Sequence, residues 1–237
     1  MQEDRVEKNI CLYRNSFPLD FCKILIDKYE ITQERIKGSA LFREQVEEIE
    51  IPTLFDPSDP DFDKETADLW LDVDMQIEDY SRVCLDAYMK HYMLEPYEYE
   101  YVGCKMLFYP AHSYSPIHYD DELVANDGGN IGSCRPINIV VYLNDDFEAG
   151  ETLFIDQNIA VKPEAGMTSI FPASYMYPHT TNPTEGSYRY ILLPFFRKAG
   201  LNAKIREYNK KEVQNKTLVK DMRSSYLPSK EYNDYKT

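Results

Sequence analysis

A change in the spacing of apolar residues near Pro96 limits what this chain can fold into more than any other feature of its sequence. Before Pro96, apolar residues recur at steps of three and four over 19–29, after Pro18, and over about 62–93, which predicts two amphipathic helices. After it come segments with the alternation or β-branched runs of strands, at 104–109, 137–143, 168–171 and 188–196. Gly, Pro, Asn and Asp separate them, as in a sandwich or barrel of short antiparallel strands. We therefore expect helices first and then an all-β body.

The composition favours an acidic globular domain and excludes several classes of protein. The 237 residues are 43% hydrophobic and carry 26 Lys+Arg against 41 Asp+Glu, a formal net charge of −15. Such a body repels phosphates and anionic lipids, so we expect no nucleic-acid partner and no membrane partner. No stretch reaches the ~18 apolar residues of a membrane span. The charged N-terminus leads into no apolar segment, so we also expect no secretory signal.

The cysteines indicate a reducing compartment. They are five in number, widely spaced and never arranged as C-x-x-C: Cys11, Cys22, Cys84, Cys104 and Cys134. This is neither a disulfide framework nor a zinc-binding pattern. We expect reduced, mostly buried thiols and a cytoplasmic location.

The charge distribution suggests one domain followed by an extension. We expect a single domain over residues 1–200, with helical support over about 1–95 and a β core over about 96–197. Residues 201–237 hold nine Lys+Arg against five Asp+Glu and are expected to form a basic C-terminal extension. The sequence indicates no particular oligomeric state.

Two histidines and one aspartate form a candidate metal site. In His118-Tyr119-Asp120, residues i and i+2 of an extended segment point to the same side, about 7 Å apart at the backbone. A single H-x-D is common, and a surface His beside an Asp remains the alternative. His179 follows an apolar strand and could supply a third ligand from a neighbouring one. Two His and one carboxylate leave the other octahedral positions open, which is the ligand set of non-haem Fe(II) oxygenases.

Arg189 is the candidate for binding an anion. Alternation along 188–196 places it on the same face as three apolar residues, Ile191, Leu193 and Phe195. A guanidinium on an apolar face is costly unless it meets an anion, and this strand holds no Asp or Glu. A ligand carboxylate held bidentately would satisfy it. An ion pair with a distant carboxylate, or a strand with the opposite orientation, remain open alternatives.

Several motifs in order resemble the 2-oxoglutarate/Fe(II)-dependent dioxygenases, and within them the prolyl 4-hydroxylase-like branch. The resemblance extends over about residues 100–197. It rests on Tyr109 preceding His118-Tyr119-Asp120, on Arg135 preceding Tyr142-Leu143-Asn144, on the stretches 147–154 and 162–171, and on His179 followed by Gly186 and Arg189. The chain departs from the family pattern in having Ala149-Gly150 for paired glycines. It also has Arg189 where many prolyl hydroxylases have Lys.

The resemblance implies a mainly β fold with flanking helices, a double-stranded β-helix (jelly roll) with an N-terminal helical layer. It implies that His118, Asp120 and His179 bind Fe(II), and that 2-oxoglutarate chelates the iron. The far carboxylate of 2-oxoglutarate would meet Arg189.

The resemblance also implies roles for three further residues. The Tyr142 hydroxyl would be a second donor to that carboxylate, and Tyr142 shares its strand face with Asn138 and Val140, which is consistent with an inward aim. Tyr109 matches a position beside the cosubstrate and Arg135 a position beside the substrate. The alternatives are a core tyrosine and a rim charge, respectively.

The implied reaction is hydroxylation of a substrate C–H by O₂, coupled to oxidative decarboxylation of 2-oxoglutarate, with ascorbate as an additional cofactor used by relatives. The expected substrate is a peptidyl proline, although residues 126–130 are expected to form a loop or lid that sets substrate choice. A hydroxylase of a free amino acid or small metabolite is the first alternative. A catalytically inert jelly-roll binding module, or a cupin-like isomerase or sugar-binding protein, are the others.

Overall fold

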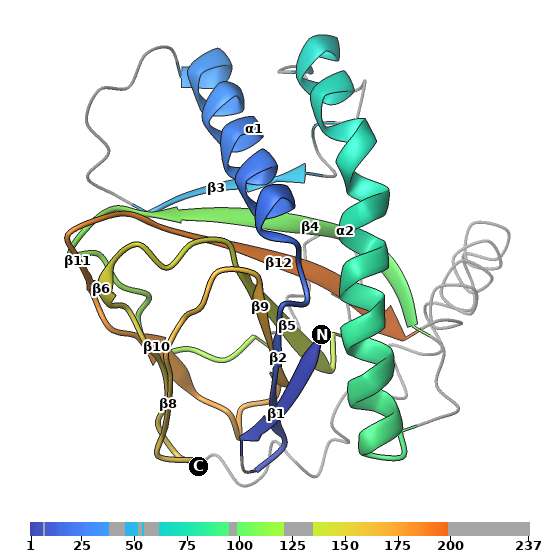
Figure 1. Ribbon diagram of the computed structural model, residues 1–237, viewed down its shortest axis with the longest axis vertical. Coiled ribbons are helices and arrows are strands. Elements are labelled where there is room, and N and C mark those ends of the chain that lie inside the picture. Colours follow the sequence, from blue (N-terminus) through green and yellow to red (C-terminus); the bar gives the residue numbers. More distant parts are fainter. Residues whose placement is uncertain are drawn as a thin grey trace, which may run out of the picture. The chain divides into compact units, whose positions relative to one another are not determined.

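A seven-stranded antiparallel sheet carries the fold (Figure 1). Its order is β1 (Gln2–Val6), β2 (Ile10–Arg14), β9 (Met167–Pro172), β5 (Ile137–Tyr142), β12 (Arg189–Lys198), β4 (Tyr99–Tyr109) and β3 (Glu47–Glu50). Apart from the hairpin of β1 and β2, neighbours in this order are not consecutive elements of the chain, so long-range pairings assemble the sheet.

The computed structural model describes residues 1–6, 8–37, 46–51, 54, 62–94, 99–120 and 135–198. These residues all belong to one compact unit, Met1–Lys198, and Ala199–Thr237 form a second unit. The predicted loop at 126–130, Cys134 and the predicted extension at 201–237 lie outside the described residues. The predicted domain boundaries therefore stay predictions.

Short strands form a second layer. One group has the order β10 (His179–Thr181), β7 (Thr152–Phe154) and β8 (Ile159–Val161), and β11 (Thr184–Glu185) pairs with β6 (Glu148–Ala149). An apolar cluster that includes Val140, Tyr142, Phe154, Phe171 and Ile191 joins this layer to the large sheet. The fold is the predicted jelly roll with flanking helices, and that prediction is confirmed.

Strand β5 contributes side chains to two apolar clusters, one on each face of the large sheet. All six of its residues are buried. Ile137, Ile139 and Val141 belong to the cluster under the helices, whereas Val140 and Tyr142 belong to the cluster between the sheets. Because side chains alternate along a strand, a sheet covered on both sides needs apolar residues at nearly every position. This two-sided burial explains the run of β-branched residues in β5.

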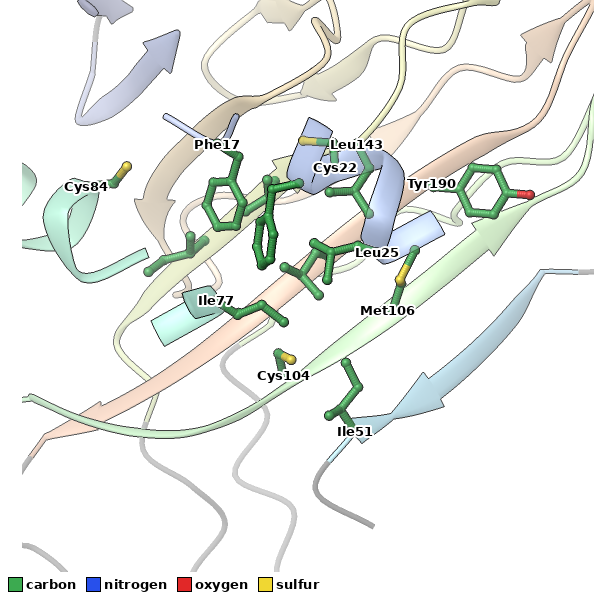
Figure 2. Close-up of a cluster of buried hydrophobic side chains, with 14 of the residues drawn as sticks. Phe17, Cys22, Leu25, Ile51, Ile77, Cys84, Cys104, Met106, Leu143 and Tyr190 are labelled. Atoms are coloured by element: carbon green, nitrogen blue, oxygen red, sulfur yellow. The ribbon is translucent and has the colours of Figure 1, made fainter. Parts of the chain in front are cut away.

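Two helices cover the outer face of the large sheet: α1 (Leu19–Lys37) and α2 (Lys64–His91) (Figure 1). Asp63 caps α2 by accepting hydrogen bonds from the backbone N–H groups of Glu65 and Thr66, which satisfies donors that a helix start leaves open. Figure 2 shows the core beneath the helices, which includes Leu25 of α1, Ile77 of α2 and Met106 of β4. None of the described helices is long and apolar enough to cross a membrane.

The structure corrects the predicted order of helices first. Strands β1 and β2 precede α1, and β3 lies between the helices. In β2, Cys11 and Tyr13 face the helix-side core, and Ile10 and Leu12 face the other core. Both faces are apolar, so the segment lacks the contrast that marks a half-buried strand. Helix α1 also continues well beyond residue 29, whereas α2 and the four later strands lie where they were predicted.

The described cysteines are buried thiols, as predicted: Cys11, Cys22, Cys84 and Cys104. Burial raises the pKa of Cys22 to about 11 and that of Cys84 to about 11. These thiols therefore stay protonated at neutral pH and pack as small apolar side chains.

Gly166 offers a test of how the first strands are held to the sheet. Its φ is +75°, and a Cβ added there would lie 2.4 Å from the carbonyl oxygen of Phe17. That oxygen is backbone, and the carbonyl of Gly166 accepts hydrogen bonds from the N–H groups of Ser16 and Phe17, so neither side can yield. We expect Gly166→Ala to lower the free energy of unfolding by roughly 3 kcal/mol, since a left-handed backbone and overpacking both contribute.

Gly186→Ala is the matched control. Its φ is +85°, but an added Cβ would meet nothing within 4 Å, so only the backbone cost of about 1 kcal/mol applies. Urea denaturation of both variants measures the difference. Equal losses would contradict the steric explanation.

Candidate metal centre

Strand pairing brings the two predicted histidine ligands together. His118 lies in an irregular segment after β4, and His179 is the first residue of β10. The N–H of His118 donates to the carbonyl of His179 (3.0 Å), and the N–H of His179 donates to the carbonyl of His118 (2.9 Å). The two residues are thus directly opposite each other, with ring centroids 4.3 Å apart. Both side chains point to the same side of the short-stranded layer.

Asp120 completes the cluster. Its backbone N–H is held by the carbonyl of Ala173. Its Oδ1 lies 3.7 Å from Nε2 of His118, and its Oδ2 lies 3.4 Å from Nε2 of His179. One ligand atom from each of the three side chains lies within 4.8 Å of the others. Adjacent ligands of an octahedral ion with bonds of ~2.1 Å are roughly 3 Å apart, so the three atoms suit one metal ion.

Hydrogen bonds place both imidazoles in the tautomer that a metal needs. Nδ1 of His118 lies 2.7 Å from the carbonyl oxygen of Pro116, and Nδ1 of His179 lies 3.1 Å from that of Tyr177. Because a carbonyl oxygen only accepts, each Nδ1 carries the proton and each Nε2 has a free lone pair. Burial lowers the pKa of His179, an effect that outweighs the opposing influence of Asp120. Its neutral, coordinating form is therefore favoured.

Asn138 orients the carboxylate. From β5, its Nδ2 donates a hydrogen bond to Oδ2 of Asp120, and its side chain is buried. Sequence reasoning placed Asn138 on the inward face but missed this role. The available signal was an amide in the middle of the apolar run Ile137-Asn138-Ile139, since a buried polar side chain requires a partner.

The three ligands open into a pocket of ≈ 220 Å³. The large sheet supplies its apolar wall: Leu107, Val140, Ile191, Leu193 and Phe195. The alternation predicted for β12 is thereby observed. Glu48, Lys105 and Arg135 also line the pocket; Glu48 is exposed, and Lys105 and Arg135 are half-buried.

Arg189 is buried beside this pocket, with 1% of its surface exposed. Nη1 donates to the carbonyl of Gly150 (3.0 Å), and Nη2 donates to Oγ1 of Thr181 (3.1 Å). The guanidinium carbon lies 4.1 Å from the centroid of the Tyr109 ring. Its Nε has no hydrogen-bond partner, and within the described residues no carboxylate forms an ion pair with it. Burial lowers the pKa of Arg189, and an incoming anion would offset that cost.

The structure places the remaining predicted site residues as follows. Tyr109 lines the pocket and packs its ring on Arg189. The buried hydroxyl of Tyr142 lies 2.9 Å from Oγ1 of Thr152 and 3.4 Å from Oγ of Ser169. Arg135 lines the pocket with its guanidinium carbon 4.2 Å from the centroid of the Phe195 ring. The assigned roles of these residues stay predictions.

Comparisons with known proteins agree with this geometry. Residues 104–197 match the family model of the 2OG-Fe(II) oxygenase superfamily, and no curated protein matches the chain. The predicted resemblance is confirmed over this segment. The superfamily implies Fe(II), 2-oxoglutarate and O₂, and the cluster of His118, Asp120 and His179 fits iron binding.

Solved structures show the same fold. The 2OG complex of viral collagen prolyl hydroxylase from Paramecium Bursaria Chlorella virus-1 has a TM-score of 0.54 at 19% identity, covering 81% of this chain and 96% of that one. A prolyl hydroxylase from Trichoplax adhaerens, in complex with a hypoxia inducible factor oxygen degradation domain peptide fragment, has a TM-score of 0.53 at 14% identity. This match covers 81% of this chain and 84% of the Trichoplax chain.

Removing one imidazole tests the metal site directly. We expect His179→Ala to weaken Co(II) binding by about 100-fold or more, because one of three ligands is lost. Absorption titration of the metal-free protein measures it. The control is His112→Asn, since His112 is exposed with a φ of 68° that Asn tolerates. Unchanged Co(II) affinity in His179→Ala would refute the site.

The hydrogen bond from Asn138 predicts a smaller effect of the same kind. Asn138→Ala leaves all three ligands in place but frees the carboxylate of Asp120 to rotate. We expect Co(II) affinity to fall about 10- to 100-fold, the usual effect of losing a partner of a metal ligand. Val140→Ala, also on the pocket face of β5, controls for lost packing, and an equal loss of affinity in both variants would argue against an orienting role.

Proposed function

We propose that this protein is an Fe(II)/2-oxoglutarate-dependent hydroxylase that acts on a C–H bond of a peptidyl proline. The balanced reaction is R–H + O₂ + 2-oxoglutarate → R–OH + succinate + CO₂. One observation carries the proposal: a two-histidine, one-carboxylate cluster shares its surroundings with a buried guanidinium that has no carboxylate partner among the described residues. A metal site alone does not require an anion, whereas this pairing does.

Bound Fe(II) would supply the activation of O₂, and the chain's own residues have separate tasks. His118, Asp120 and His179, which line the pocket, would hold the ion. Arg189 binds the far carboxylate of 2-oxoglutarate. The Tyr109 ring packs against the guanidinium of Arg189. Leu107, Val140, Ile191 and Leu193 keep water away from the reacting carbon.

The substrate class rests on the two prolyl hydroxylases of the same fold, one of them solved with a peptide. Arg135 is the residue we assign to substrate contact. The use of ascorbate is part of the proposal, as is a cytoplasmic location, which the buried thiols support.

Arg189 gives the sharpest test of the cosubstrate site. We expect Arg189→Ala to raise the KM for 2-oxoglutarate at least tenfold, because a charged hydrogen-bonding partner of the far carboxylate is lost. Arg189→Lys keeps the charge and should recover part of that loss, which separates anion binding from a general loss of folding. Succinate formation at varied 2-oxoglutarate measures both. A KM like the parent's in Arg189→Ala would contradict the assignment.

Mass spectrometry distinguishes the possible functions. The protein is incubated with Fe(II), 2-oxoglutarate, O₂ and either proline-containing peptides or free amino acids, and a one-oxygen mass gain is sought. A gain in peptides supports the proposal, and a gain only in free amino acids replaces its substrate. Chelation of Fe(II) and 2-oxoglutarate with no succinate formed would indicate an inert binding module.

A further inference from the structure

The cationic side chains around the pocket differ in how their charge is balanced. Lys105 lies 3.1 Å from a carboxylate oxygen of Glu48 and 3.0 Å from one of Glu50, so two acids neutralise it. Arg189 is buried and occupied by the proposed cosubstrate. Arg135 has no ion pair with any described carboxylate, and its Nε is buried without a hydrogen-bond partner. Among the residues that the structure describes, Arg135 is thus the pocket-lining cation that still lacks an anion.

The Phe195 ring holds Arg135 without satisfying it. The guanidinium carbon lies 4.2 Å from the ring centroid, so the aromatic face covers one side of the planar group. A ring face attracts a cation but accepts none of its in-plane hydrogen bonds. Arg135 lines the pocket, and no described residue accepts a hydrogen bond from its Nε. In a chain of net charge −15, an uncompensated cation at this place is informative.

We propose that the substrate presents a carboxylate to Arg135, close to the carbon that is hydroxylated. The inference rests on the proposed hydroxylase function and adds a charge requirement to it. A carboxylate matches the planar fork of a guanidinium bidentately. A phosphate dianion fits less well, because Asp120 and Glu48 line the same pocket and would repel the second charge.

Chain geometry puts this carboxylate near the metal site. Arg135 precedes Asn138 by three residues, at most about 10 Å of extended backbone, and Asn138 donates to the ligand Asp120. The pocket of ≈ 220 Å³ is smaller than the ~300–1,000 Å³ of typical small-molecule sites. Fe(II) and 2-oxoglutarate would take part of this volume, so the space that remains suits no more than one side chain or one small amino acid. The carboxylate is therefore either the α-carboxylate of a free amino acid or an Asp or Glu side chain beside the target residue of a peptide.

The experiment compares acids with their uncharged amides in two arms. One arm uses proline-centred peptides with Asp or Glu beside the proline against the same peptides with Asn or Gln. The other uses free amino acids against their amides. Each compound is incubated with the full chain, Fe(II), 2-oxoglutarate and O₂, and kcat/KM is measured from the one-oxygen mass gain. Preference for acids in the first arm identifies a peptide substrate, and preference in the second a free amino acid.

Three variants assign the preference to Arg135. We expect the parent to favour the acid at least tenfold, on the order of one hydrogen bond between charged groups. Arg135→Gln should reduce this preference to about twofold or less, and Arg135→Lys should retain part of it. Arg197→Gln should keep the parent's preference, because Arg197 lies on β12, pairs with Glu100 at 2.6 Å and does not line this pocket. Circular dichroism verifies that each variant is folded.

The outcomes separate this inference from the proposed function. Equal use of acids and amides, or a preference that survives in Arg135→Gln, overturns the role of Arg135 while the hydroxylase assignment stands. Hydroxylation of neither form, with succinate still produced, overturns it as well. No succinate with any compound overturns both proposals.

Discussion

The paired backbone hydrogen bonds between His118 and His179 hold the two imidazoles at one point of the fold. They attach an otherwise irregular segment to the edge of the short-stranded layer. Because directly opposite residues in an antiparallel pair project to the same side, the register alone makes the rings neighbours. Asp120 follows two residues later and shares that side. The candidate metal site of three side chains thus depends on one bridge.

Around this bridge, polar groups fix the three candidate ligands and Arg189 by hydrogen bonds. Nearest the ligands, the carbonyls of Pro116 and Tyr177 fix the imidazoles, and Asn138 fixes the carboxylate. Beside the pocket, Arg189 is held by neutral groups only among the described residues. Neutral donors and acceptors position a charge without cancelling it. In the proposed function, the anion-binding position at Arg189 and the metal position consequently do not neutralise each other.

Much of this arrangement was predictable from sequence, for reasons that particular residues make clear. The inward face of β12 followed from simple alternation, and the helix α2 from its long apolar stripe. The ligand set followed from H-x-D spacing and a later histidine, once other motifs in the same order supported it. Strand β2 was missed because both of its faces are buried, and the short strands of the second layer were missed because two or three residues carry no period. Asn138 was missed as an orienting residue because its partner lies 18 positions earlier in the chain.

Because both faces of β5 are buried, this strand connects the core under the helices to the pocket. Ile139 and Val141 pack in the cluster under the helices, while their neighbours Asn138 and Val140 form part of the pocket. Packed interiors transmit strain instead of absorbing it, so a methylene gained or lost beneath α2 displaces the strand that aims an amide at Asp120. We therefore expect substitutions beneath the helices, at residues that do not line the pocket, to change how Asn138 orients the carboxylate of Asp120.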